Sequence, residues 1–158
     1  MLVEGEIGIG DGWWLVLREP YDGAVSEDNH TVLQQSTRMI MPQTISADPA
    51  TMQLSPAEFL AGLVEDTRSD PHSNLIDLGP ISGHGWVGHL FREPLSPERG
   101  EFQLLGLLSA PATVLNLAVR FLGAEGEDEA RQVITDVVHD PASREQMNAQ
   151  IREQMGIE

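Results

Sequence analysis

The sequence predicts an α+β protein: one antiparallel β-sheet of five to seven strands with helices packed on its faces. This prediction rests on four consecutive apolar segments joined by short turns in the second half of the chain, and on two segments with helical periodicity. A chain of 158 residues with neither an internal repeat nor a low-complexity segment fits one domain. We assign residues 1–140 to this domain and residues 141–158 to a C-terminal helical extension.

The predicted strands are bounded by segments rich in turn-forming residues. In the last strand Leu117, Val119 and Phe121 alternate with small or polar residues, which predicts one buried and one part-polar face. Because four of the strands are consecutive and their loops are short, we expect an antiparallel meander. The predicted strands are Trp13–Arg18, Thr31–Met41, Leu75–Ser82, Trp86–Arg92, Phe102–Ser109 and Thr113–Leu122.

The clearest local signal predicts a helix over residues 56–68. Ser55 is placed as the N-cap, a proline follows at the first helical position, and Glu58 at the third position completes a capping box. Leu54 and Phe59 stand where a hydrophobic staple places them. A Ser-Asp-Pro segment then ends the helix.

Two further helices are predicted near the C-terminus. The first covers residues 127–139 and has acids in its first turn, where the helix dipole favours them. The second runs from Pro141 to about Met155, with a narrow apolar stripe of Met147, Ile151 and Met155. Such a stripe covers little surface, so this segment either docks on a partner or frays.

The composition excludes several kinds of chemistry. The chain has no lysine and no cysteine, which removes Schiff-base, P-loop and thiolate chemistry. Its formal net charge of −16, with nine scattered arginines, argues against nucleic-acid and anionic-lipid partners. A basic protein partner is compatible with this charge, although acidity also serves solubility.

The N-terminal segment carries acids where the basic region of a signal peptide is expected. The longest uncharged stretch, Phe102–Val119, approaches the length of a membrane span but is interrupted by polar residues and a proline. We therefore expect a cytoplasmic protein without a membrane segment.

One part of the sequence resembles a known family. The segments Leu75–Pro80, Gly83–Gly85 and Glu129–Ile134, together with the two strands between them, carry the resemblance, and Gly12-Trp13 and the helix after Ser55 fall at comparable places. In this order they resemble the PsbP/Mog-like α/β/α sandwich. That family includes photosystem II extrinsic subunits, Ran-binding import factors, bacterial lipoproteins and type VI secretion effector chaperones. The resemblance implies a binding or chaperone module without conserved chemistry.

A glycine-rich segment at Gly83–Gly88 matches the dinucleotide pattern G-x-G-x-x-G. That pattern needs a following helix to hold the pyrophosphate, whereas a strand is predicted here, so we interpret it as a turn between two strands. His84 and His89, five positions apart, point to opposite faces of a strand, which argues against a shared metal. His89 is interpreted as a satisfied imidazole within the sheet.

Other candidate ligands also favour a structural interpretation. Asp136, His139 and Asp140 share a face of the predicted helix, but this face is the solvated one, and the helix dipole explains a histidine near its end. The acids between Glu125 and Glu129 lack the alternate spacing of a calcium loop. No cofactor and no metal is therefore predicted.

The remaining candidate site is for a partner. Strand alternation sends Trp13 and Trp14 to opposite faces, so we expect one indole to be partly exposed and available for binding. With Met147, Ile151 and Met155 these residues form the predicted partner-binding set. The sequence favours a non-enzymatic protein-interaction module, a chaperone or an adaptor, that binds a protein partner of basic character or associates with itself. A small hydrolase using histidine and carboxylates, and a small-ligand carrier, remain the alternatives.

Overall fold

The computed structural model describes residues 2–25, 31–46, 54–71 and 74–141. Within these ranges a single antiparallel sheet of nine strands dominates the fold. The strands are β1 (Leu2–Gly10), β2 (Trp13–Val25), β3 (Thr31–Gln34), β4 (Arg38–Ser46), β5 (Ile76–Gly83), β6 (Trp86–Ser96), β7 (Glu101–Ala110), β8 (Thr113–Leu122) and β9 (Val138–His139). The helices are α1 (Pro56–Arg68), α2 (Gly126–Thr135) and a 3₁₀ turn at Pro97–Arg99.

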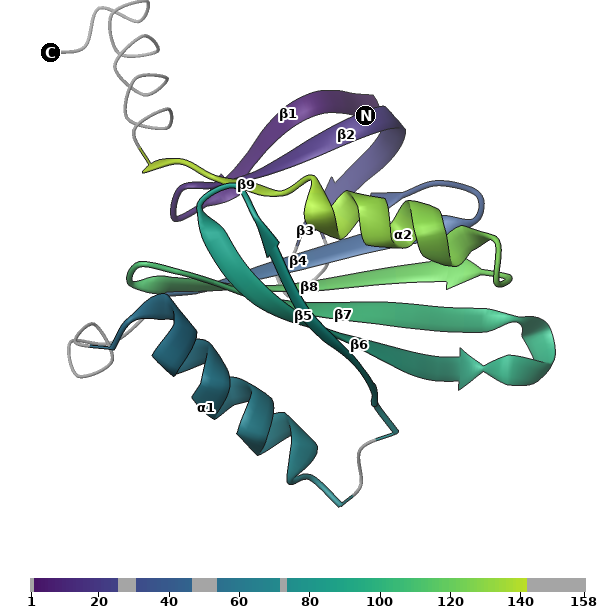
Figure 1. Cartoon of the computed structure of the whole chain (residues 1–158). Coiled ribbons are helices and arrows are strands. Elements are labelled where there is room, and N and C mark those ends of the chain that lie inside the picture. Colours follow the sequence, from purple (N-terminus) through teal and green to yellow (C-terminus); the bar gives the residue numbers. More distant parts are fainter. Residues whose placement is uncertain (1, 26–30, 47–53, 72–73, 142–158) are drawn as a thin grey trace, which may run out of the picture.

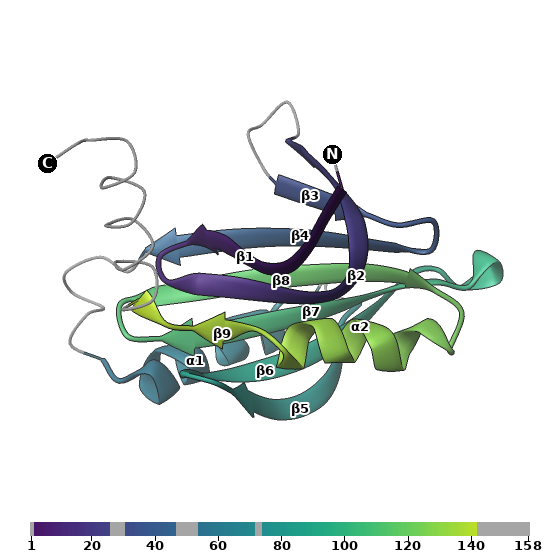
Figure 2. The ribbon, with the colours of Figure 1, turned by 90° about the horizontal axis from the view of Figure 1, so that it is seen from above.

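The order of the strands is β1-β2-β3-β4-β8-β7-β6-β5, with β9 paired to β2. Figures 1 and 2 show three layers: the β1–β2 hairpin and α2 lie on one face of the β4-β8-β7-β6-β5 sheet, and α1 lies on the other. We call the first the inner face and the second the outer face. Both helices are crossovers, since α1 links β4 to β5 and α2 links β8 to β9.

The predicted α+β class with five to seven strands is wrong. Strands make up 61% and helices 21% of the structure, and the sheet has nine strands. Three strands account for the difference. The prediction missed β1, merged β3 with β4 and assigned β9 to a helix. The antiparallel meander of β5, β6, β7 and β8 is as expected.

The inner face holds the main core. Trp13, Trp86 and the inward residues of β8 form one cluster with Ala130, Ile134 and other apolar residues of the inner layer. Gly106 on β7 lets α2 approach closely, because a Cβ at that position would lie 3.1 Å from the Cγ2 of Ile134.

Three arginines from three strands fasten α2 over this core. The Nε of Arg18 donates to Asp136 at 2.8 Å, and Arg92 on β6 donates to Glu127 at 2.9 Å. Arg38 is the buried member. It donates to Glu129 and, at 2.7 Å, to the hydroxyl of Tyr21, whose pKa is raised by burial. Each of the three arginines thus contacts an acid in α2 or directly after it, so α2 is attached to β2, β4 and β6.

The outer face has a smaller core under α1. Leu60 and Val64 of α1 pack with Phe91 of β6 and Leu107 of β7. The predicted bounds of this helix are confirmed, and so is the capping box, since Ser55 accepts from the backbone N–H of Glu58 and the Glu58 carboxylate accepts from that of Ser55.

The second predicted helix ends earlier than expected. α2 stops at Thr135, and the chain then forms β9, where His139 pairs with Trp13 and donates its N–H to the carbonyl of His84. The assignment of His139 to a solvated helix face is therefore wrong: the side chain is buried, and burial lowers its pKa. Adjacent β-branched residues at 137 and 138 favour the strand, and the open edge of β2 supplies its partner.

Candidate functional site

The outer face of the sheet is ordered in rows that cross four strands. The registers β4–β8, β8–β7 and β7–β6 place one residue of each strand opposite the next. Side chains alternate between faces, so every second row points outward. From one end of the sheet to the other, the outward rows are Met39–Arg120–Gln103–Glu93, Met41–Ala118–Leu105–Phe91, Gln43–Asn116–Leu107–His89 and Ile45–Val114–Ser109–Val87.

Helix α1 lies over the β6 and β7 side of these rows and not over the β4 and β8 side. It packs against β6 and β7, where Phe91 and Leu107 are buried. Among the described elements, no helix packs extensively on the outward side of β4 and β8, although Val114 at the start of β8 is buried. Met39, Met41 and Ala118 are only half-buried there, and Ile45 is 47% exposed. We call this area the β4–β8 strip; it consists of Met39, Met41, Gln43, Ile45, Asn116, Ala118 and Arg120.

One flank of α1 faces the strip. Arg68, at the end of the helix, contacts Asp77 on β5 and so marks the flank that faces away from β8. At about 100° per residue, Phe59 lies about 180° around the helix from Arg68, and Leu63 about 140°. Both side chains are half-buried. Apolar residues therefore border the strip on the α1 side.

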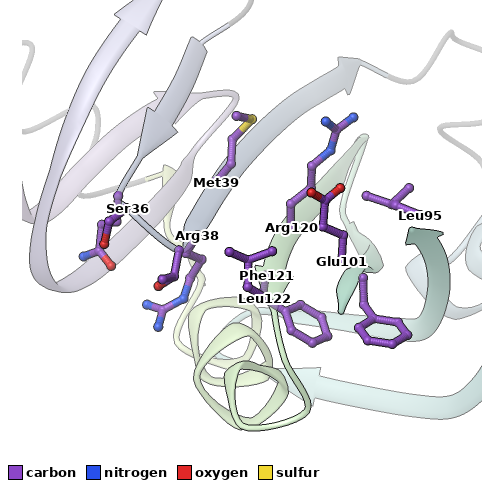
Figure 3. Close-up of a pocket in the computed structure, with 11 residues that line it drawn as sticks. Ser36, Arg38, Met39, Leu95, Glu101, Arg120, Phe121 and Leu122 are labelled. Carbon is purple, nitrogen blue, oxygen red and sulfur yellow. The ribbon is translucent and has the colours of Figure 1, made fainter. Parts of the chain in front are cut away.

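A cavity of about 220 Å³ lies at the Met39 end of the strip. Figure 3 shows Met39, Arg120, Glu101 and Leu95 around it, with Phe121 and Leu122 beside them. A polar chain crosses the strands here: Arg120 donates to Gln103 at 3.3 Å, and Gln103 donates to Glu93 at 3.1 Å. The end row thus combines one exposed cation with apolar neighbours, a composition typical of protein-binding surfaces.

Three further cavities are small or open. One of about 170 Å³ lies between β2 and α2, and one of about 260 Å³ lies beside Phe102 and Phe121 at the start of α2. Both are below the size usual for a drug-sized ligand, roughly 300–1,000 Å³. A wider one of about 430 Å³ lies at the turns near Asp11 and Ala112 and includes His139 and Pro141.

A carboxylate–histidine pair joins β5 and β6 beside α1. His89 is buried, and its Nε2 lies 2.6 Å from Asp77 Oδ1. This hydrogen bond, with that from Arg68, lowers the pKa of the Asp77 carboxyl to about 2. The interpretation of His89 as a satisfied imidazole is confirmed. In the part of the chain that is described, the hydrogen bonds of His89 include none with a serine hydroxyl, and His89 does not line any of the four cavities given above. The pair fastens the end of α1 to the sheet.

The predicted exposure of one tryptophan is wrong. Trp13 is 1% exposed and Trp14 is 8% exposed. The two rings do lie on opposite faces, but Trp14 is covered by β1, where a Cβ on Gly8 would be 3.3 Å from the ring. Its Nε1 also donates to the carbonyl of Asp140 at 3.4 Å. Neither indole therefore offers an exposed binding surface.

The other candidate residues lie either in the turn between β5 and β6 or in residues 142–158, outside the described part of the chain. His84 and Gly85 form the turn between β5 and β6, as the glycine pattern predicts, and Gly85 lies directly against β9. No group of three or more metal-ligating side chains occurs among the described residues. Met147, Ile151 and Met155 lie outside the described residues. The β4–β8 strip was not predicted, because only the crossover path of α1 reveals which part of the face stays open.

No helix of the described structure is both long enough and apolar enough to span a membrane. No family model matches the sequence, and none of the curated proteins is similar to it. The fold is similar to that of a Bacteroides thetaiotaomicron protein of known crystal structure, with a TM-score of 0.62 and 8% identity over 87% of this chain. This chain spans 49% of the length of that protein. At such low identity, the likeness concerns the fold alone.

Proposed function

We propose that this chain is a non-enzymatic protein-interaction module, and that the β4–β8 strip is its binding surface. The observation that carries the proposal is the half-covered outer face, on which α1 packs on β6 and β7 while β4 presents Met39, Met41 and Ile45. Methionine adapts its shape to different partners, which suits a binding surface better than a rigid core. Contiguous apolar surface of this kind marks protein contacts in other proteins.

The two alternatives receive less support. A hydrolase needs a nucleophile beside its histidine and a cavity for substrate, whereas the described contacts of the Asp77–His89 pair only tie β5, β6 and α1 together. A small-ligand carrier needs an enclosed pocket, and the two cavities between the sheet and α2 measure about 170 and 260 Å³, whereas the one of about 430 Å³ is an open hollow at the turns.

The net charge of −16 indicates the character of the partner. A second copy carries the same charge, so long-range repulsion disfavours self-association, whereas a basic protein is attracted. Binding should accordingly weaken as salt is raised, because the Debye length falls to about 3 Å at 1 M.

The test is affinity capture from the native cell with three baits. Ile45→Glu places a charge on the strip, and Leu2→Glu places the same charge on β1 at a residue that is 72% exposed. We expect one set of proteins to be captured by the unsubstituted chain and by Leu2→Glu, and to be lost with Ile45→Glu. Melting temperatures of all three baits serve as the control for folding. Equal capture by both variants would overturn the assignment of the strip.

A further inference from the structure

We propose that residues 142–158 of this same chain dock on the β4–β8 strip when no partner is bound, and that a partner has to displace them. This inference rests on the proposed function, because it concerns the regulation of the same surface. Four features of the described structure and of the sequence carry it: the width of the strip, its length, the place where the described chain ends, and the character of the final residues.

The strip has the width of one helix. Neighbouring strands lie about 4.8 Å apart, so β4 and β8 together offer about 10 Å. A helix with its side chains is about 10–12 Å across. α1 already occupies the neighbouring two strands, β6 and β7, and turns its apolar flank with Phe59 and Leu63 toward the strip. A second helix laid beside α1 therefore completes the outer layer and contacts both the sheet and α1.

The described chain ends at the same end of the sheet as Ile45, on the inner side. The strand β9 and Asp140 are held firmly, since the N–H of Asp140 donates to the carbonyl of Gly12 at 2.8 Å. The following residue, Pro141, lines the same cavity as Ala112 and Thr113. Thr113 is the first residue of β8 and pairs with Ser46, directly beyond Ile45. The final residues thus start at the Ile45 end of the sheet and have only to pass around that end to reach the strip.

The length of the final segment also fits. From Ile45 to Met39 the strip measures about 20 Å, at about 3.4 Å per strand residue. Residues 142–158, if helical, reach about 25 Å at about 1.5 Å per residue. A few residues are thus available to pass around the end of the sheet before the strip begins.

The sequence of the final segment suits the strip. Met147, Ile151 and Met155 recur at every fourth position and form a narrow apolar stripe. Because the strip is only two strands wide, a helix with a narrow apolar stripe is sufficient to cover it. The segment also contains Arg144 and Arg152, so it is nearly neutral and escapes most of the repulsion that an acidic helix meets on this chain.

The experiment uses the natural absence of cysteine. In the full chain, Ile151→Cys is combined with Met41→Cys on the strip or, as the matched control, with Leu2→Cys on β1. A short bismaleimide is added to dilute protein, and the products are separated by size and mapped by peptide mass spectrometry. We expect an intramolecular cross-link in the strip pair, at several-fold higher yield than in the control pair.

Each other outcome has a defined meaning. Cross-linked dimers in the strip pair would overturn the proposal in favour of a tail that docks on a second copy. Equal yields in the strip and control pairs would overturn it in favour of an undocked tail. A third variant, Met41→Cys/Ile151→Cys/Ile45→Glu, should lose the cross-link while its melting temperature is retained.

This result is separable from the proposed function. Capture by the Ile45→Glu bait tests the strip as a partner site whether or not the tail docks there. If the tail does dock, the full chain with Ile151→Glu, which places a charge on the apolar stripe of the tail, should capture more partner than the unsubstituted chain, and equal capture by the two would contradict the regulatory role.

Discussion

The two faces of the sheet are closed to different degrees. On the inner face, a hairpin, a helix and β9 cover the apolar rows, and arginines from β2, β4 and β6 contact acids at the level of α2. On the outer face, one helix covers two strands and leaves most of the outward residues of the neighbouring two half-buried or exposed. The difference teaches that the inner face supplies stability, whereas the outer face leaves apolar surface uncovered, which is the surface that we propose for partner binding.

The largest expected effect contrasts one isoleucine from each face. Ile134→Ala removes a fully buried side chain from α2 and should lower the free energy of unfolding by about 2–5 kcal/mol. Ile45→Ala, on the strip, should lower it by less than about 1 kcal/mol. Urea denaturation measures both. Similar losses at the two positions would mean that the strip is part of the core.

The next largest effect on stability is expected at the capping box that begins α1. Ser55→Ala removes the side-chain acceptor of the capping box and should cost about 0.5–2 kcal/mol. Hydrogen exchange should increase in α1 and leave the amides of β9 unaffected, because the seam of β9 with β2 lies on the other layer. Loosening of both regions together would show that the faces unfold as one unit.

The other end of α1 responds to pH. The pKa of Asp77 is held at about 2, below its usual 3.8, by His89 and then by Arg68. A carboxyl with a lowered pKa stabilises the folded state above about pH 4, and this stabilisation is lost as the pH falls toward 2. Asp77→Asn should therefore cost about 1 kcal/mol at pH 7, after allowance for the partial exposure of the carboxylate. The difference between the two proteins should shrink at pH 2, as measured by urea denaturation at both pH values.

The smallest effect lies in a turn that belongs to neither face. Ala112, between β7 and β8, has a φ of 64°, a left-handed conformation that disfavours residues with a Cβ. Ala112→Gly should raise the free energy of unfolding by about 0.5 kcal/mol, because the relief of strain exceeds the added entropy of the unfolded chain. A loss of stability would show that the alanine methyl makes a contact that outweighs the strain.

Local signals in the sequence were sufficient for some elements. The N-cap, the proline and the acid at the third position define α1 to the residue, and strict alternation defines β8. Other elements depend on distant partners. β1 contains Gly5, Gly8 and Gly10, which are disfavoured in strands, yet Gly8 provides the surface that Trp14 covers. β9 is two residues long and forms because β2 and the turn at His84 lie on either side of it.

The candidate site was beyond such local reasoning. Tryptophan scarcity drew attention to Trp13 and Trp14, but the contacts that bury them come from β1, β8 and the chain after α2. The openness of the strip follows from the path of α1, which crosses from β4 to β5 over the intervening strands and settles on β6 and β7. The alternation of Met39, Met41 and Ile45 along β4 indicates that they share a face of the strand. It does not indicate which part of that face the crossover helix leaves uncovered.

The most direct test of the strip as the interaction surface is oxidative footprinting of its methionines. Hydroxyl radicals oxidise accessible methionine side chains, and mass spectrometry reads the rate at each residue. In a complex of the chain truncated after Asp140 with the captured partner, the oxidation rates of Met39 and Met41 should fall several-fold relative to the same truncated chain alone. Unchanged rates at both methionines, in a complex that is demonstrably formed, would contradict the account.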